Sequence, residues 1–212
     1  TPAEVDRATA LAVEIAAASA QSSNGPVSLG PPVTSRGVYT TPIKIDPFSI
    51  SLEDKLGLLL EADQRMGSVK GISARMGNLI FIKEHKTFAN SEGALVEQTI
   101  YEAGGGIMAT ARGIGEVQRR SYPQSMRQQG CSGWEFVAAM DLPGNAERVA
   151  TEAVALLTAD PCPRDVVTTL IVGGAQLALQ IHESCGHAIE LDRVLGAEAA
   201  YAGTSFLTTD KL

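Results

Sequence analysis

The sequence predicts an α+β fold: an antiparallel β-meander packed with long helices, followed by the start of a second α+β domain. Apolar residues recur at helical spacing within residues 52–66 and 145–159, which indicates two amphipathic helices. Between residues 69 and 122 the apolar residues alternate instead, and short glycine-containing segments interrupt the pattern. At 212 residues, 44% of them hydrophobic, the chain is long enough to bury a substantial core.

Shifts in composition divide the chain into four segments. Residues 1–22 are rich in alanine and are predicted to form an amphipathic helix from the end of an N-terminal domain. Residues 23–48 are rich in Ser, Gly, Pro and Thr and are expected to form a linker. Residues 49–161 are predicted to form a central α+β domain, and residues 162–212 the start of a C-terminal domain. The chain starts without methionine and ends without a visible closing element, so we interpret it as a piece of a longer protein.

The central domain is expected to open and close with a helix. Ser49 or Ser51 caps the first, which runs to about Met66, and Asn145 caps the second, which runs to about Ala159. Glycine-containing turns at residues 77–78, 104–106 and 113–115 separate successive strands of the meander. The predicted strands are Val69–Met76, Leu79–Glu84, Gly93–Glu102, Ile107–Arg112 and Gly115–Tyr122.

The C-terminal segment begins after a Pro-Cys-Pro sequence that ends the second helix. Val166–Val172 is an apolar run predicted to be a buried strand, and Gly173-Gly174 turns the chain. A helix is then expected from about Ala175, anchored by its apolar face. This helix carries the most informative residues of the chain.

The composition excludes several classes of function. A net charge of −7 and a pI near 5.0, without a basic stripe, argue against a nucleic-acid partner. No apolar run reaches the length of a membrane span, and no signal-peptide pattern opens the chain, so we expect a cytoplasmic location. The three cysteines show no framework of spacings, which favours reduced thiols over disulfides.

Two of the three histidines lie close together in the C-terminal segment. His182 and His187 flank Glu183, and the residues between them read HESCGH. Two neutral imidazoles with an adjacent carboxylate are what a hydrolytic zinc site needs: two nitrogen ligands and a base for the attacking water. The alternative from the residues alone is a buried helix that carries two histidines with satisfied hydrogen bonds.

The spacing of this pair requires a distorted helix. Five positions on a regular α-helix place two side chains about 140° apart, which is too far for both to hold one ion. A π turn between His182 and His187 would bring them together, and Gly186 would give the backbone that freedom.

The wider pattern, His-Glu-x-x-Gly-His-x-x-Glu, resembles the TldD-type, motif-bearing members of the TldD/PmbA family. Weaker similarity extends over most of residues 40 to 212. It includes Asp192-Arg193, Gly-Thr-Ser-Phe at 203–206, Asp-Pro-Phe at 46–48 and Asn-Ser-Glu-Gly at 90–93.

The resemblance implies a zinc-dependent metallopeptidase that cleaves unfolded or short peptides, such as leader peptides or flexible antitoxins. His182 and His187 would hold the zinc, a third ligand resembling a cysteine would lie beyond Leu212, and Glu183 would act as general base. The resemblance also implies a homo- or hetero-oligomer, the latter with a PmbA-type paralogue around an enclosed cavity. From its spacing alone, Glu190 could accept the second N–H of His187, or it could pair with Arg193.

Two other interpretations stay open at this point. A cysteine hydrolase would use Cys185 with His187, and Cys185 could also be a third metal ligand, although a packing role is favoured. The chain could instead belong to a non-catalytic interaction or regulatory subunit of a peptidase complex. Cys131 and Cys162 show no ligand-like spacing, and His85, alone in a lysine-rich strand edge, is expected to be a surface residue.

Overall fold

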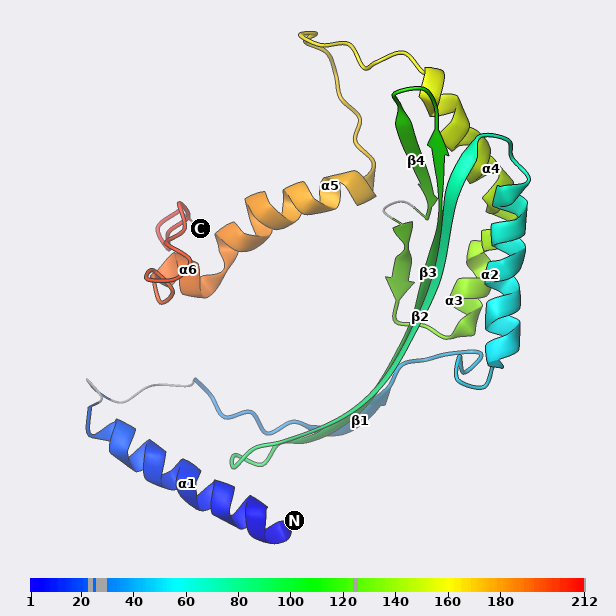
Figure 1. The fold of residues 1–212 in the computed structure, drawn as a ribbon. Coiled ribbons are helices and arrows are strands. Elements are labelled where there is room, and N and C mark those ends of the chain that lie inside the picture. Colours follow the sequence, from blue (N-terminus) through cyan, green and yellow to red (C-terminus); the bar gives the residue numbers. More distant parts are fainter. Residues whose placement is uncertain (23–24, 26–29, 124–125, 212) are drawn as a thin grey trace. The chain divides into compact units, whose positions relative to one another are not determined.

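The protein has the α+β architecture that the sequence predicts (Figure 1). We describe it from a computed structural model, which describes residues 1–22, 25, 30–123 and 126–211. The chain forms two compact units, one of residues 1–38 with 87–97, the other of residues 39–86 with 98–212. The second unit contains the hydrophobic core and the histidine segment.

A five-stranded sheet is built around one central strand, β3 (Leu95–Arg112). On one side β3 pairs with β2 (Ile72–Ala89), and on the other with β1 (Arg36–Thr40). Two further strands pair antiparallel with β3, namely β4 (Val117–Tyr122) and β5 (Gln128–Gly130). The sheet is therefore more than a simple meander, and β1 lies within residues 23–48, which the composition had indicated as linker.

The predicted turns at residues 77–78 and 104–106 are wrong, because both segments lie inside long strands. Their glycines allow close packing. A Cβ on Gly77 would lie 3.0 Å from Leu59, and one on Gly105 would lie 2.8 Å from the carbonyl oxygen of Asn78. A Cβ on Gly106 would collide with the carbonyl of Met126. Glycine inside a strand marks a place where another part of the chain approaches closely, and that is its role here.

Helices cover one face of the sheet (Figure 1). They are α2 (Leu52–Gly67), α3 (Trp134–Met140) and α4 (Leu142–Ala155), which continues into the short turn η2 (Leu156–Thr158). Ser51 is confirmed as the cap of α2, since its Oγ accepts the N–H of Asp54 at 3.0 Å. The predicted cap Asn145 is wrong: Asp141 caps α4 and accepts the N–H of Gly144 at 3.0 Å.

The core lies between α2, α4 and the sheet. Its buried side chains are small and medium in size, which lets the helices approach the sheet closely. They are Ala62, Met66, Ile107, Ala109, Ala111, Met140, Leu142, Ala146, Val149, Ala150 and Ala153. Ile107, Ala109 and Ala111 alternate along β3 with residues on the opposite face, as a strand with one helix-covered face requires.

The N-terminal helix is confirmed as α1 (Pro2–Ala20), and none of its residues is buried. The linker expected over residues 23–48 is only partly described, since residues 23–24 and 26–29 lie outside the described part of the chain.

The C-terminal segment departs from the prediction at its start. Val166–Val172 is not a buried strand: the segment has no regular structure, and Val167 and Ile171 are fully exposed. A strand needs a hydrogen-bonded neighbour, and within the described ranges none pairs with this segment. Helix α5 (Gly174–Ile181) follows, then the turns η3 (His182–Gly186) and η4 (His187–Ile189), and α6 (Leu191–Leu195). In the described residues, no helix is long and apolar enough to cross a bilayer.

Candidate metal centre

The two histidines are brought together by a π turn at the end of α5. Residues 182–186 form η3, in which the helix is wound more widely than an α-helix, as the five-residue spacing predicts. The N–H of His187 bonds to the carbonyl of His182, five residues earlier. The wider turn rotates the second imidazole back onto the side of the first.

Gly186 is not what permits this turn. Its φ of −56° and ψ of −57° are helical values open to any residue. A Cβ at this position would meet only the carbonyl oxygen of Ile181, at 3.9 Å. The expectation that Gly186 supplies special backbone freedom is therefore wrong.

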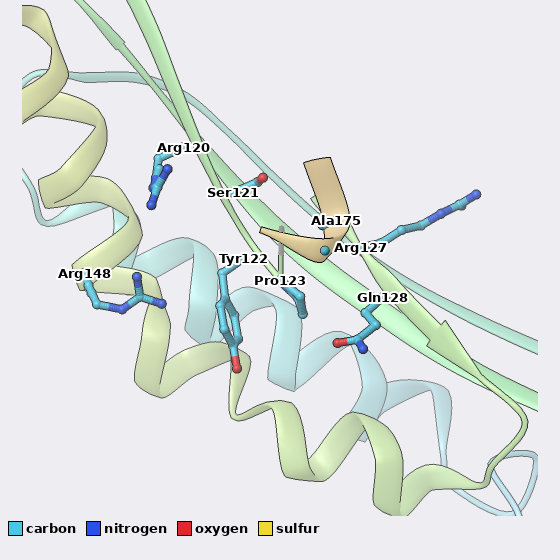
Figure 2. A pocket seen from close by; sticks show the side chains of 9 residues that line it. Arg120, Ser121, Tyr122, Pro123, Arg127, Gln128, Arg148 and Ala175 are labelled. Carbon is cyan, nitrogen blue, oxygen red and sulfur yellow. The ribbon is translucent and has the colours of Figure 1, made fainter. Parts of the chain in front are cut away.

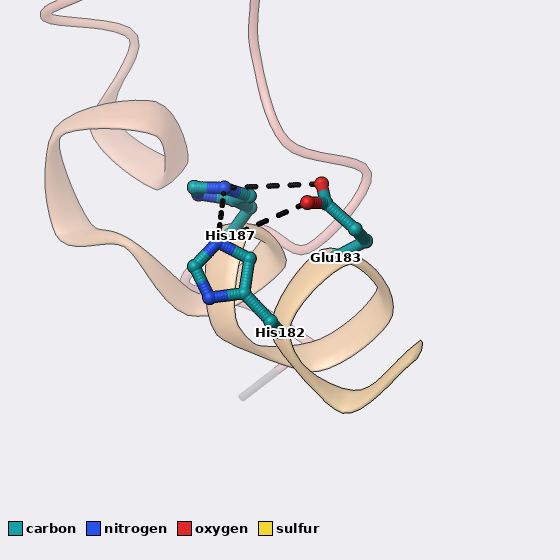
Figure 3. Close-up of side chains that lie close together, drawn as sticks. All are labelled: His182, Glu183 and His187. Atoms are coloured by element: carbon teal, nitrogen blue, oxygen red, sulfur yellow. Dashed lines mark hydrogen bonds and ion pairs between the residues drawn. The ribbon is translucent and has the colours of Figure 1, made fainter. Parts of the chain in front are cut away.

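His182, Glu183 and His187 form one group on the surface of this segment (Figure 3). The Nε2 atoms of the two histidines lie 2.9 Å apart, with the ring planes at 87°. Each Nε2 also lies 3.8 Å from an oxygen of Glu183. The side chains of His182 and Glu183 are 61% and 58% exposed, so the group faces outward and is open to a ligand.

His187 is held from behind by Glu190, whose Oε1 lies 2.7 Å from Nδ1 of the ring. A carboxylate can only accept at this contact, so the proton of a neutral His187 lies on Nδ1 and Nε2 is left with its lone pair. The two sequence-level alternatives for Glu190 occur together, because its Oε2 lies 2.7 Å from Nε of Arg193. That Nε is buried and makes no hydrogen bond of good geometry to the described residues, so the contact is an ion pair.

Sequence reasoning did not identify how this segment is tied together. Ser205 donates its hydroxyl to the carbonyl of Ala188 at 2.7 Å, and its N–H bonds to the carbonyl of Arg193 at 3.1 Å. Two contacts from one residue fix the chain after α6 against the turn that carries His187. The Gly-Thr-Ser-Phe segment at residues 203–206 was visible in the sequence, but these residue types alone do not indicate which part of the chain Ser205 contacts.

The geometry of the group fits a zinc ion. Two nitrogens bound at about 2.0–2.1 Å in tetrahedral geometry lie about 3.3 Å apart, so a small rotation of either ring from the observed 2.9 Å suffices. Neutral imidazole nitrogens and a carboxylate are also the donors that zinc prefers. The ligand atoms of His182, Glu183 and His187 all lie within 4.8 Å of one another.

The other reactive residues of the described chain lie outside this group. Cys185 is exposed on the same turn, but its sulfur is not among the ligand atoms that converge. Cys131 and Cys162 are exposed free thiols. His85 is exposed on β2, where its Nδ1 lies 3.1 Å from Oγ1 of Thr99.

A histidine-glutamate-histidine group on an α+β fold is the kind of centre found in metal-dependent hydrolases. Comparison with known proteins agrees. Residues 45–157 match the central domain of PmbA/TldA metallopeptidases. The chain therefore belongs to the PmbA/TldD family.

Two curated relatives, both named "Metalloprotease", share similarity with more of the chain. The one from Archaeoglobus fulgidus is 24% identical over 173 residues, which is 81% of this chain and 38% of the relative. The one from Methanothermobacter thermautotrophicus is 27% identical over 160 residues, or 74% of this chain and 33% of the relative. The chain thus spans about a third of the length of these relatives. The matched family is described as one of metallopeptidases, and both relatives are named as metalloproteases.

Proposed function

We propose that this chain carries the catalytic residues of a zinc-dependent metallopeptidase of the TldD type, which cleaves unfolded or short peptides. The observation that carries the proposal is the convergence of His182, Glu183 and His187 on one side of a π turn. It is supported by membership of a metallopeptidase family and by relatives named as metalloproteases.

His182 and His187 would hold the ion through their Nε2 atoms, with a third ligand supplied from beyond Leu212. When bound there, zinc supplies Lewis acidity, which polarises the peptide carbonyl and makes a water molecule acidic. Glu190 keeps the His187 ring turned so that Nε2 faces the ion, since it fixes Nδ1 on the opposite side of the ring.

Glu183 is the proposed general base. Its carboxylate lies 3.8 Å from each Nε2, beside the place an ion would occupy and not behind a ligand. From there it can take the proton of the attacking water and pass it to the nitrogen of the leaving amine. Glu183 lies on the π turn with His182, and His187 follows that turn directly, so the backbone keeps the three residues close together.

The substrates proposed for the whole protein are leader peptides or flexible antitoxins, which the family resemblance implies. We also propose assembly as a homo-oligomer or with a PmbA-type paralogue, and a cytoplasmic location. An unfolded substrate is consistent with a catalytic group on a surface turn, because an extended peptide can reach it without a preformed side-chain pocket.

The experiment that tests the function is elemental analysis of the protein purified without chelator or immobilised metal, comparing wild type with His182→Ala. Near-stoichiometric zinc in the wild type that is lost in the variant supports the proposal. His85→Ala is the control, because His85 lies outside the group and its loss is expected to leave the metal content unchanged. Absence of transition metal from the wild type would overturn the proposal in favour of a non-catalytic subunit.

A further inference from the structure

A pocket of about 760 Å3 lies beside the end of β4, and none of the three metal-site residues lines it (Figure 2). Arg120 and Tyr122 of β4, Arg148 of α4 and Gln128 of β5 contribute to its wall. Gly174, the first residue of α5, also lines the pocket. Its lining residues come from four elements, β4, β5, α4 and α5, so the pocket is assembled by the fold.

The pocket is cationic in a chain with a net charge of −7. Arg120 and Arg148 share a single carboxylate, that of Glu152, at 2.6 and 2.8 Å. One negative charge thus faces two guanidinium groups. In the part of the chain that the structure describes, no Asp or Glu lines the pocket itself. A net positive charge therefore remains for a ligand.

The arginines are held in place. Arg148 lies over the ring of Tyr122, 5.4 Å from its centroid, and donates to the side chain of Asn145 at 2.9 Å. Arg120 meets Glu152 through Nε, so the donors on its two terminal nitrogens can serve a second acceptor. Figure 2 shows Arg120, Tyr122 and Arg148 grouped on one side of the pocket. Arg127 also lines the pocket, but its side chain extends away from this group, and we assign it no role.

The start of α5 adds to the positive potential. Gly173 precedes the helix and offers no side-chain cap, so the first N–H groups of α5 are not satisfied by a side chain. The N-terminus of a helix carries a partial positive charge, and here its first two residues, Gly174 and Ala175, line the pocket.

We propose that the pocket formed by Arg120, Tyr122 and Arg148 binds a carboxylate of the peptide substrate. Guanidinium groups present parallel N–H donors that match the two oxygens of a carboxylate. This inference rests on the proposed peptidase function, which identifies the ligand as a peptide. It predicts that the peptidase prefers acidic peptides.

Helix α5 sets the distance between the pocket and the metal centre. Eight residues separate Gly174 from His182, which corresponds to about 12 Å along a helix. An extended peptide covers about 12 Å in roughly four residues. A peptide that runs along α5 would therefore place about four residues between Gly174 and the metal centre.

The test is equilibrium binding of fluorescent peptides to the 212-residue chain, measured by anisotropy. Three eight-residue peptides are compared: one with a single central Glu and an amidated C-terminus, its Gln counterpart, and the Gln peptide with a free C-terminus. We expect the Glu peptide, the free C-terminal peptide or both to bind about fivefold more tightly than the neutral peptide. Arg120→Gln is expected to abolish the difference.

The matched control is Arg119→Gln. Arg119 is the exposed neighbour of Arg120 on β4, and its side chain points to the opposite face and does not line the pocket. The control makes the same change in net charge, and thermal melts verify that both variants fold. Retention of the preference in Arg119→Gln and its loss in Arg120→Gln supports the proposal.

Three results would overturn it: equal binding of charged and neutral peptides, equal effects of the two variants, or no binding of any peptide. Stronger competition by inorganic phosphate than by acetate would likewise overturn it and assign the pocket to a phosphoryl ligand. Failure of the peptidase function has a different signature, namely no zinc in the metal analysis. The carboxylate preference is measured without metal or turnover, so the two results are independent.

Discussion

The Nε2 atoms of His182 and His187 lie 2.9 Å apart although five positions separate the residues. On a regular α-helix the two rings would point about 140° apart. The π turn of residues 182–186 removes that separation and leaves Glu183 beside both rings. The chemistry proposed for the chain depends on this distortion.

Glu183→Gln is expected to keep the metal and lose the reaction. The amide is isosteric with the carboxylate but cannot take a proton from water, and loss of a general base typically reduces turnover by about 10²- to 10⁴-fold. The measurement is peptide cleavage by the full-length protein together with its zinc content. Glu198→Gln, which changes a carboxylate outside the metal group, should leave both unchanged. Loss of zinc in Glu183→Gln would instead make Glu183 a ligand.

Glu190→Ala is expected to weaken zinc binding by about 10- to 100-fold, because the His187 ring loses the acceptor at Nδ1 that fixes its orientation. The dissociation constant can be measured by competition with a chromogenic chelator. Arg193→Gln should have a smaller effect in the same direction, since Arg193 contacts only the other oxygen of Glu190. Equal affinity of wild type and Glu190→Ala would show that this contact does not orient His187.

The distorted helix could be predicted from the sequence. His182 and His187 are five positions apart, and on a regular α-helix this spacing does not let both rings reach one ion. The capping role of Ser51 was equally readable, since a serine three residues before an acidic residue opens the helix. These features depend on neighbours in sequence. The pairing of Glu190 with Arg193, three positions away, was readable for the same reason. The contacts of Ser205 were not identified, because they depend on how the chain folds back after α6.

The strand errors have a different cause. Gly77 and Gly106 look like turn residues in a sequence, since glycine is the commonest signal for a turn. They are inside β2 and β3 because Leu59 and the Met126 carbonyl occupy the space that a side chain would fill. Val166–Val172 was predicted as a buried strand from its apolar composition, but within the described ranges no strand pairs with it. Each error concerns a contact with residues distant in sequence.

Glu135 gives the fold a pH dependence that can be measured. Partial burial raises the pKa of its carboxyl group, but the N–H groups of Lys44, Ile45 and Gly133 at 3.0–3.1 Å and its own N–H outweigh that effect. Together they lower the pKa from 4.5 to about 2. Because the folded-state pKa is depressed, the stabilisation is complete above about pH 4.5 and is lost as the pH falls toward 2.

Glu135→Gln is therefore expected to lower the free energy of unfolding by about 2 kcal/mol at pH 7, since charge-assisted hydrogen bonds to a carboxylate are lost. The difference from wild type should shrink between pH 4.5 and pH 2.5, measured by urea denaturation at each pH. The exposed Glu147→Gln on α4 is the control and should show a smaller difference. A difference that is constant with pH would contradict the assignment.

Two glycine-to-alanine substitutions should change stability in opposite directions. A methyl group on Gly106 would collide with the backbone of Met126 and Arg127, which cannot move aside as a flexible side chain can. Gly106→Ala is therefore expected to destabilise the protein by about 2 kcal/mol.

Gly57 lies within α2, and a Cβ there meets nothing within 4 Å. Gly57→Ala should stabilise the protein by about 0.5–1 kcal/mol, because alanine has the higher helix propensity. Urea denaturation midpoints at pH 7 measure both, and a stable Gly106→Ala variant would show that the segment after β4 does not pack against β3 at this position.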